Sequence, residues 1–207
     1  MIVRKLAEII RIRLYGGQPS DDAPITLRQV AIEIVAEAAQ AAKENFYENA
    51  NVEAWNYVND EYTTRYTGVT TATDSTTGLK YATLPAPVVG LPKNRGIVKV
   101  YPGFGYKGDF LKIAAKDVSI YTEGPTIPKS VLYWLEGGKI YFYPCGLTVP
   151  SQVVVTMIGQ LGTMSEELNV PAEALKLIED RVVAKLQPMA NTLIDNTNDN
   201  ISVRDRQ

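Results

Sequence analysis

The sequence contains no histidine and a single cysteine, and these two absences exclude more than any other feature of the composition. Without histidine there is no Ser-His-Asp or Cys-His catalytic arrangement and no imidazole ligand for a metal. The usual general base for neutral pH is also missing. The lone Cys145 excludes an internal disulfide and a zinc site built from several cysteines, and it is predicted to be a small buried filler. We therefore expect a protein that is not an enzyme and that needs no metal or other cofactor.

Long apolar runs and an excess of one charge are missing as well. No stretch approaches the roughly 20 apolar residues that span a bilayer, and charges interrupt the basic segment 1–14 too often for a signal peptide. A transit peptide is an alternative for that segment. The formal charge of −2 gives no reason to expect a nucleic-acid binder, whereas 45% hydrophobic residues are enough for a core. These features predict synthesis in a reducing cytoplasm and no membrane partner.

Apolar residues at helical spacing predict four helical segments. The first covers residues 2–14 and stops at two glycines. The second follows a capping box at Thr26 and Gln29 and runs to about Glu48 through an alanine-rich stretch. The third, residues 52–66, carries aromatic residues three and four positions apart and is interpreted as a separate helix or as an extension of the second. The last begins at Pro171 and is expected to kink or end at Pro188.

Short apolar runs with glycine and proline between them predict a β region after residue 79. The expected strands are 97–101, 109–114, 117–121, 131–135, 139–144 and 151–159. The clearest feature is a hairpin around Gly137-Gly138, in which both faces of the strands are apolar or aromatic. Because a sheet with one solvated face alternates apolar and polar residues, the second face of this hairpin is expected to be covered.

The predicted fold class is α+β, with a helical bundle that carries an inserted small antiparallel β domain. The bundle is assigned to residues 1–66 and 165–195, and a β-sandwich or barrel-like module to residues 79–160. Residues 67–78 hold six threonines and few large apolar side chains, so they are expected to be a mobile loop. Residues 196–207 are expected to form a tail.

Charge is shared unevenly along the chain. Residues 1–17 carry +3, residues 18–68 carry −6 and residues 80–139 carry +5. One interpretation is that each element simply has a solvated polar surface. The other is a polar molecule whose ends attract the opposite ends of neighbours.

Three motifs have a chemical meaning that their context does not support. Residues 103–108 match GxGxxG, but no helix follows to receive a phosphate, so a glycine-rich turn is the preferred interpretation. Adjacent acidic pairs such as Asp21-Asp22 lack the spacing of a calcium loop. Basic and aromatic residues interleave over 93–112. This pattern is compatible with a contact to nucleic acid, but a sheet with its lysines turned outward is the preferred interpretation.

The order of these segments resembles the head–tail connector proteins of short-tailed bacteriophages, also called adaptor, collar or ring proteins, with those of crAss-like phages as the nearest comparison. The resemblance lies in an amphipathic first helix, an alanine-rich second helix and the segments LPKNRGIVKVYP, YWLEGGKIYFYP and VPAEALKLIEDRVVAKL. It covers most of the chain, and no diagnostic motif carries it.

The resemblance implies a virion structural protein at the head–tail junction. Such subunits form homo-oligomeric rings, commonly twelve-fold, below the portal protein, contact neighbouring tail and connector rings, and let genomic DNA pass without sequence-specific binding. A nearly neutral chain suits that role, because a strongly basic channel would hold the phosphates. The chain would be made in the cytoplasm of the bacterial host.

Eight side chains are predicted to lie at protein–protein contacts: Arg4, Arg11, Arg13, Trp55, Tyr62, Trp134, Tyr141 and Tyr143. An alternative function is a soluble ligand- or carbohydrate-binding module, with Trp55, Trp134 and the tyrosines as its platform. Another virion part, such as a tail-tube or head-decoration protein, is a further alternative. The mass in solution distinguishes a binding module, which stays monomeric, from a ring subunit, which assembles.

Overall fold

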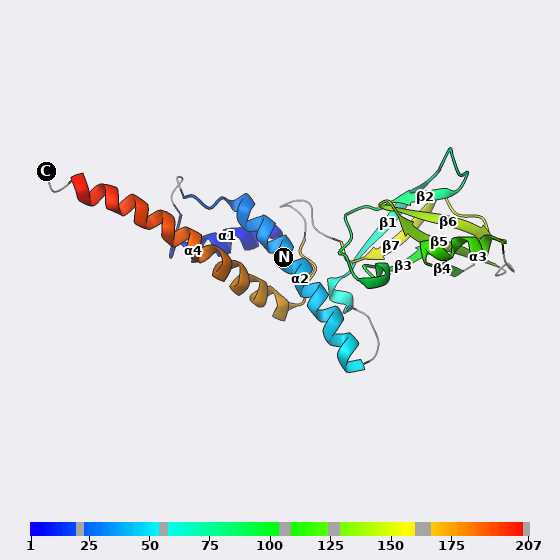
Figure 1. Ribbon diagram of the computed structural model, residues 1–207, viewed down its shortest axis with the longest axis horizontal. Coiled ribbons are helices and arrows are strands. Elements are labelled where there is room, and N and C mark those ends of the chain that lie inside the picture. Colours follow the sequence, from blue (N-terminus) through cyan, green and yellow to red (C-terminus); the bar gives the residue numbers. More distant parts are fainter. Residues whose placement is uncertain (20–22, 54–57, 104–108, 124–128, 160–166, 205–207) are drawn as a thin grey trace. The chain divides into compact units, whose positions relative to one another are not determined.

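The computed structural model describes residues 1–19, 23–53, 58–103, 109–123, 129–159 and 167–204 (Figure 1). Contacts divide the chain into a helical unit, Met1–Tyr62 with Leu161–Gln207, and a β unit, Thr63–Gln160. The α+β class is therefore correct. The expected helical bundle with a small inserted antiparallel domain is wrong, because the described residues form four α-helices and a seven-stranded, mixed and nearly closed sheet.

The helical unit contains α1 (Val3–Leu14), α2 (Leu27–Glu53) and α4 (Ala172–Arg204), and each of these helices contacts the other two. A short 3-10 helix, η1 (Asp60–Tyr62), also belongs to this unit. Apolar side chains at helical spacing face inward, and the fully buried ones include Val3, Leu6 and Ile10 of α1, Val30 and Ile34 of α2, and Ile178 and Val182 of α4. The amphipathic pattern thus forms one apolar core for three helices.

Two predictions about helix ends have opposite outcomes. The capping box at the start of α2 is confirmed: the Thr26 backbone N–H donates to Gln29 Oε1 at 2.8 Å and the Gln29 N–H donates to Thr26 Oγ1 at 3.2 Å. The alternative that the last helix ends at Pro188 is wrong, because α4 continues to Arg204 through the expected tail. Leu186 and Ala190 are buried on either side of Pro188, and their packing outweighs one lost backbone hydrogen bond.

The sheet of the β unit has the order β3-β7-β1-β2-β6-β5-β4. Its strands are β1 (Thr64–Thr73), β2 (Lys80–Thr83), β3 (Ile97–Pro102), β4 (Asp109–Lys112), β5 (Ser130–Glu136), β6 (Lys139–Cys145) and β7 (Gln152–Met157). All pairs are antiparallel except β4 and β5, which are parallel. The inner face holds an apolar core that includes Ile97, Tyr133, Ile140, Phe142 and Val155.

The threonine-rich segment is the main source of the wrong fold prediction. Residues 64–73 form β1, which pairs with both β7 and β2, so a loop prediction is wrong there. Threonine is β-branched and fits a pleated strand whose neighbours supply the apolar contacts. The helix expected over residues 52–66 is wrong for its second half, where η1 is followed by β1 from Thr64, whereas α2 extends to Glu53 and residues 54–57 lie outside the described residues.

The parallel pair explains a second misassigned segment. The sequence pattern predicts a strand over residues 117–121, but these residues belong to the 3-10 helix η3 (Ala115–Asp117) and to α3 (Val118–Glu123). Two parallel neighbours need a crossover connection rather than a tight turn, and η3 and α3 lie in that connection. A sequence pattern of five residues cannot separate a short helix from a short strand.

The hairpin of β5 and β6 is confirmed in its predicted register. Trp134 pairs with Tyr141 and Leu135 pairs with Ile140. Gly137 and Gly138 have φ of 56° and 75°, the left-handed values that a two-residue hairpin turn requires.

The two outermost strands of the sheet, β3 and β4, approach each other and are joined by side chains. Lys112 Nζ on β4 donates hydrogen bonds to the Ile97 carbonyl of β3 at 3.1 Å and to the Asn94 carbonyl at 2.7 Å. A hydrogen bond also joins the Val100 backbone to Tyr133, whose burial raises its pKa to about 12. We call this junction of β3 and β4 the seam. It occupies part of the free strand edges that an open sheet would expose.

Candidate interaction surfaces

Three aromatic residues lie in a row across the outer face of β2, β6 and β5. The register places Tyr81 opposite Tyr141 and Tyr141 opposite Trp134, so all three point to the same side of the sheet. The rings of Trp134 and Tyr141 are stacked with centroids 5.7 Å apart, and those of Tyr81 and Tyr141 are 5.9 Å apart. We call Tyr81, Tyr141 and Trp134 the aromatic row.

The polar atoms near the aromatic row are bound within the β unit. Trp134 Nε1 donates to Glu136 Oε2 at 3.2 Å, and the Tyr141 hydroxyl donates to Asp74 Oδ2 at 3.4 Å. Backbone N–H groups of Thr76 and Thr77 donate to the Asp74 carboxylate and hold its pKa below the ordinary value. The aromatic row is therefore fixed in place by a turn and a strand end rather than held ready for acid–base chemistry.

Burial distinguishes the predicted hairpin residues from one another. Trp134 is 4% exposed and its neighbour on the same face, Leu132, is 1% exposed. Tyr141 and Tyr143 are half-buried. At Trp134 the covering expected for the second face of the hairpin is therefore supplied by the chain itself. Tyr141 and Tyr143 keep accessible surface, and for them an intermolecular contact stays a prediction.

An open groove of about 590 Å³ lies beside Tyr143, between the turn that joins β1 to β2 and the connection from β6 to β7. Leu79, Lys80, Pro144 and Leu147 are among the residues that line it. None of the described residues that line the groove carries a carboxylate, and Lys80 Nζ donates to the Val149 carbonyl at 2.8 Å. The groove thus offers shape and apolar surface but no pair of groups for acid–base catalysis.

A second surface of the β unit gathers positive charge on the outer face of β1, β7 and β3. Arg65 on β1 and Lys99 on β3 both pair with Thr156 of β7, so the three residues form a row across the strands. The Arg65 guanidinium lies 5.5 Å and Lys99 Nζ lies 5.4 Å from the ring centroid of Tyr101. We call Arg65, Lys99 and Tyr101 the basic face. The basic and aromatic stretch singled out in the sequence includes Lys99 and Tyr101 but misses Arg65, which comes from the threonine-rich strand.

The three predicted arginines of α1 are engaged within the helical unit. Arg4 forms an exposed ion pair with Glu8 at 3.1 Å, and Arg11 Nε donates to the Ile25 carbonyl at 3.0 Å. Arg13 binds Glu179 and Asp180 of α4 at 2.9 and 2.8 Å, and its hydrogen bonds to these carboxylates raise the pKa of its guanidinium. The structure therefore gives Arg11 and Arg13 roles in holding α1 to its neighbours.

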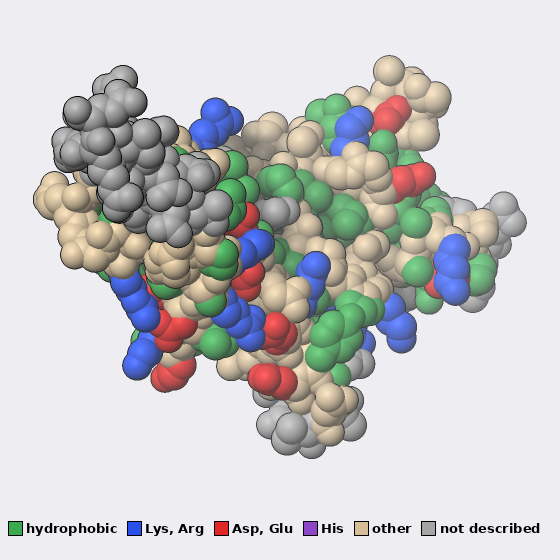
Figure 2. All heavy atoms as spheres, turned by 60° about the vertical axis from the view of Figure 1, so that its left-hand side comes forward, with side chains coloured by type: hydrophobic (Ala, Val, Ile, Leu, Met, Phe, Trp, Pro, Cys, Tyr) green, Lys and Arg blue, Asp and Glu red, His purple; other side chains and the backbone are tan. Residues whose placement is uncertain are grey.

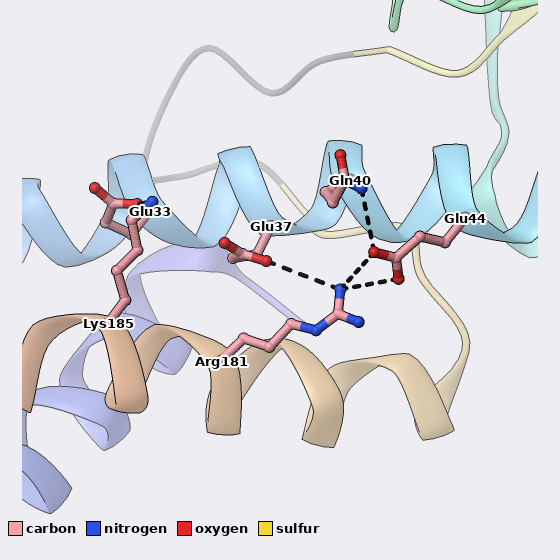
Figure 3. Close-up of polar contacts among 6 residues, drawn as sticks. All are labelled: Glu33, Glu37, Gln40, Glu44, Arg181 and Lys185. Atoms are coloured by element: carbon pink, nitrogen blue, oxygen red, sulfur yellow. Dashed lines mark hydrogen bonds and ion pairs between the residues drawn. The ribbon is translucent and has the colours of Figure 1, made fainter.

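Ion pairs also join α2 to α4, as Figure 3 shows. Arg181 points from α4 toward α2 and lies 2.9 Å from Glu44 and 4.0 Å from Glu37. One turn further along α4, Lys185 pairs with Glu33. Sequence periodicity places these residues on helices, but the pairing depends on how α2 and α4 lie against each other.

The predicted Tyr62 is buried and surrounded by negative charge. Its side chain is 8% exposed, and burial raises the pKa of its hydroxyl, with Glu48, Glu44, Glu61 and Glu173 adding to the effect. The last predicted residue, Trp55, lies outside the described residues.

The two units carry opposite net charge. The β unit, residues 63–160, has ten basic and five acidic residues, a formal charge of +5. The helical unit has 11 basic and 18 acidic residues, a formal charge of −7. On the face that Figure 2 shows, blue and red side chains lie beside one another rather than in two separate blocks.

Comparisons with known proteins do not identify the chain: no protein-family model and no curated protein matches it. Within the described ranges, no three histidine, cysteine, aspartate or glutamate side chains are grouped so that they could hold a metal ion. No helix in the part of the chain that the structure describes is both long and apolar enough to cross a membrane. Cys145 is buried and unpaired, in the filler position that the sequence predicts.

Proposed function

We propose that the protein is a non-enzymatic virion subunit that forms a homo-oligomeric ring in a phage head–tail connector, below the portal protein. The ring would serve as a conduit for DNA ejection and as a docking platform for neighbouring tail proteins. The proposal rests on the resemblance drawn from the sequence and on the charge and surface properties of the two units.

The observation that carries the proposal is the opposite charge of the two units in one chain. A subunit with −7 on one unit and +5 on the other repels a copy presented in the same orientation and attracts a copy presented head to tail. Head-to-tail contacts use two different surfaces of each subunit, and they close into a ring when the rotation between subunits fits.

Apolar side chains at the surface of the helices supply a second reason. Ile9 and Ile12 of α1 are 41% and 44% exposed, and Ile32 of α2 is 58% exposed. Exposed isoleucines are tolerated singly, but burying them against a neighbour would contribute about 25 cal/mol for each Å² removed from water. A ring subunit has such neighbours on both sides.

The alternative of a carbohydrate-binding module needs an aromatic platform open to solvent. Of the aromatic row, Trp134 is 4% exposed and cannot present its ring to a sugar. Tyr81 and Tyr141 are half-buried, and their faces are taken up by each other and by Lys139, whose Nζ lies 4.2 Å from the Tyr81 centroid. These contacts favour an internal, structural role for the row.

The deciding experiment is the mass of the purified full-length chain in solution. Light scattering and negative-stain electron microscopy should find rings, formed by the protein alone or on a portal ring, that dissociate as salt screens the opposite charges. A chain that stays monomeric at 100 µM, with and without portal protein, would contradict the proposal.

A further inference from the structure

The basic face has two positive groups and no internal anion. Arg65 and Lys99 are both exposed and both lie within 5.5 Å of the centroid of the Tyr101 ring. Neither forms an ion pair with a carboxylate in the described part of the chain. The aromatic ring of Tyr101 attracts each cation, but the two cations repel each other. An anionic group brought to this face would relieve that repulsion.

The backbone of the basic face is fixed, so the two charges are presented at a defined spacing. Arg65 and Lys99 sit in strands on either side of β7, each paired with Thr156. Val154, which pairs with Tyr101, is 6% exposed, so the tyrosine lies over a buried part of the sheet. The backbone of this surface therefore has little freedom to lose on binding, and the ordering cost falls on the two long side chains.

The complementary charge is present on the other unit of the same chain. Many carboxylates of the helical unit are already paired, including Glu8, Glu33, Glu37, Glu44, Glu179 and Asp180. Glu48, Glu61 and Glu173 are exposed and form no ion pair among the residues described. These three come from α2, η1 and the first turn of α4. Asn59, whose carbonyl accepts from the Tyr62 N–H, is held to α2: its N–H donates to Asn45 Oδ1 at 3.0 Å, and Asn49 Nδ2 donates to its Oδ1 at 3.2 Å. The charges of all three carboxylates also act on the Tyr62 hydroxyl. They therefore gather around one buried tyrosine.

We propose that the basic face of one copy binds the helical unit of a second copy, with Arg65 and Lys99 opposite the carboxylates around Tyr62. This inference rests on the proposed ring and names the surfaces that join its subunits. Each copy would offer a basic face to one neighbour and its carboxylates to the other, as a head-to-tail ring requires. The charges would set the register and speed of association, and the apolar and aromatic groups around them would contribute most of the affinity.

The test uses two charge-reversed variants of the full-length protein, R65E/K99E and E48K/E61K. Each variant alone loses one side of the contact, and the concentration for half-assembly should rise at least tenfold for each. Mixed in equal amounts, the variants should form rings again, because an alternating ring pairs each reversed surface with a surface of opposite charge. A contact within one chain would not be restored by mixing.

A matched control reverses two exposed lysines elsewhere in the β unit, K93E/K116E, which changes the net charge by the same amount. It should assemble within threefold of the wild type. Thermal melting of every variant should stay within a few degrees of the wild type, since all of these side chains are exposed. The inference is overturned if R65E/K99E assembles like the wild type, or if a mixture of the well-folded variants remains unassembled. Neither result contradicts the proposed ring itself.

Binding of a fluorescent 30-base-pair DNA of arbitrary sequence tests nucleic acid as the alternative partner of the basic face. If R65E/K99E still forms rings but loses DNA binding at 50 mM salt, the basic face contacts phosphates and the proposed contact between copies is wrong. If the wild type itself forms no assembly under any condition, the proposed function fails, and the inference fails with it. If both variants lose the rings and the mixture recovers them, the result supports the proposed function and the proposed contact together.

Discussion

The helical unit and the β unit are stabilised in different ways. In the helical unit, ion pairs such as Arg13 with Asp180 and Arg181 with Glu44 lie at the rim of an apolar core built by three helices. In the β unit, the sheet is held by strand pairing, an apolar core and hydrogen bonds across the seam. Salt and pH should therefore act on the two units differently.

The largest expected effect is on the core of the β unit. Phe142 is fully buried and its ring lies 5.8 Å from that of Phe110 in an edge-to-face contact. Phe142→Ala should lower the free energy of unfolding of this unit by about 3–5 kcal/mol, since it removes a large side chain and leaves a cavity. Denaturant titration followed by tyrosine and tryptophan fluorescence measures the loss.

The same variant tests whether the units unfold separately. Helical circular dichroism at 222 nm should persist where the β unit of Phe142→Ala has already unfolded. Leu111→Ala, at a position 38% exposed, is the control and should cost much less. Simultaneous loss of both signals would show one cooperative transition instead of two.

A somewhat smaller effect is expected at the aromatic row, and it separates core from contact. Trp134→Ala should cost about 3 kcal/mol, because its 4% exposed ring stacks on Tyr141. Tyr143→Ala, at a half-buried position beside the groove, should cost about 1 kcal/mol and weaken assembly more than folding. Melting temperature and light scattering on the same samples distinguish these outcomes. Equal stability losses for the two variants would place Tyr143 in the core as well.

The helical unit should respond to salt through Arg181. Arg181→Met removes the pairs with Glu44 and Glu37 and should lower stability by about 0.5–1 kcal/mol, with a smaller difference from the wild type in 0.5 M salt. Arg4→Met, which breaks the exposed pair within α1, is the control and should cost less than about 0.5 kcal/mol. Urea titrations at low and high salt measure both. A salt-independent loss would mean that Arg181 acts through the packing of its methylene groups.

The smallest expected effect is the pH response of the seam. Burial of the Lys112 ammonium, with a contribution from Arg95, lowers its pKa to about 8 from the ordinary 10.5. The folded protein therefore binds this proton less well than the unfolded chain. Stability should rise as the pH goes from about 8 to 10.5 and stay constant, with respect to this group, below pH 8.

The rise should stay below about 1 kcal/mol because much of the Lys112 side chain is exposed to water. Lys112→Met should abolish this rise and leave the Ile97 carbonyl without the ammonium donor. Urea titrations at pH 7, 8.5 and 10 on both proteins measure the slope. An equal slope in wild type and variant would assign it to another group.

Local patterns of the sequence determined α1, the start of α2 and the best-defined hairpin. The capping box of Thr26 and Gln29, the apolar spacing of α1 and the Gly137-Gly138 turn act over a few residues, so they can be recognised without knowing the fold. Zero histidines and a single cysteine likewise limit the chemistry of the protein, because composition does not depend on how the chain folds.

Only the tertiary structure decided the sheet and the surfaces built on it. The threonines of β1 form a strand because β7 and β2 lie beside them, and the parallel pairing of β4 and β5 turns an expected strand into α3. Arg65 meets Lys99, and Arg181 meets Glu44, across separations of 34 and 137 residues. Such pairings depend on register and packing between distant segments, and no local pattern encodes them.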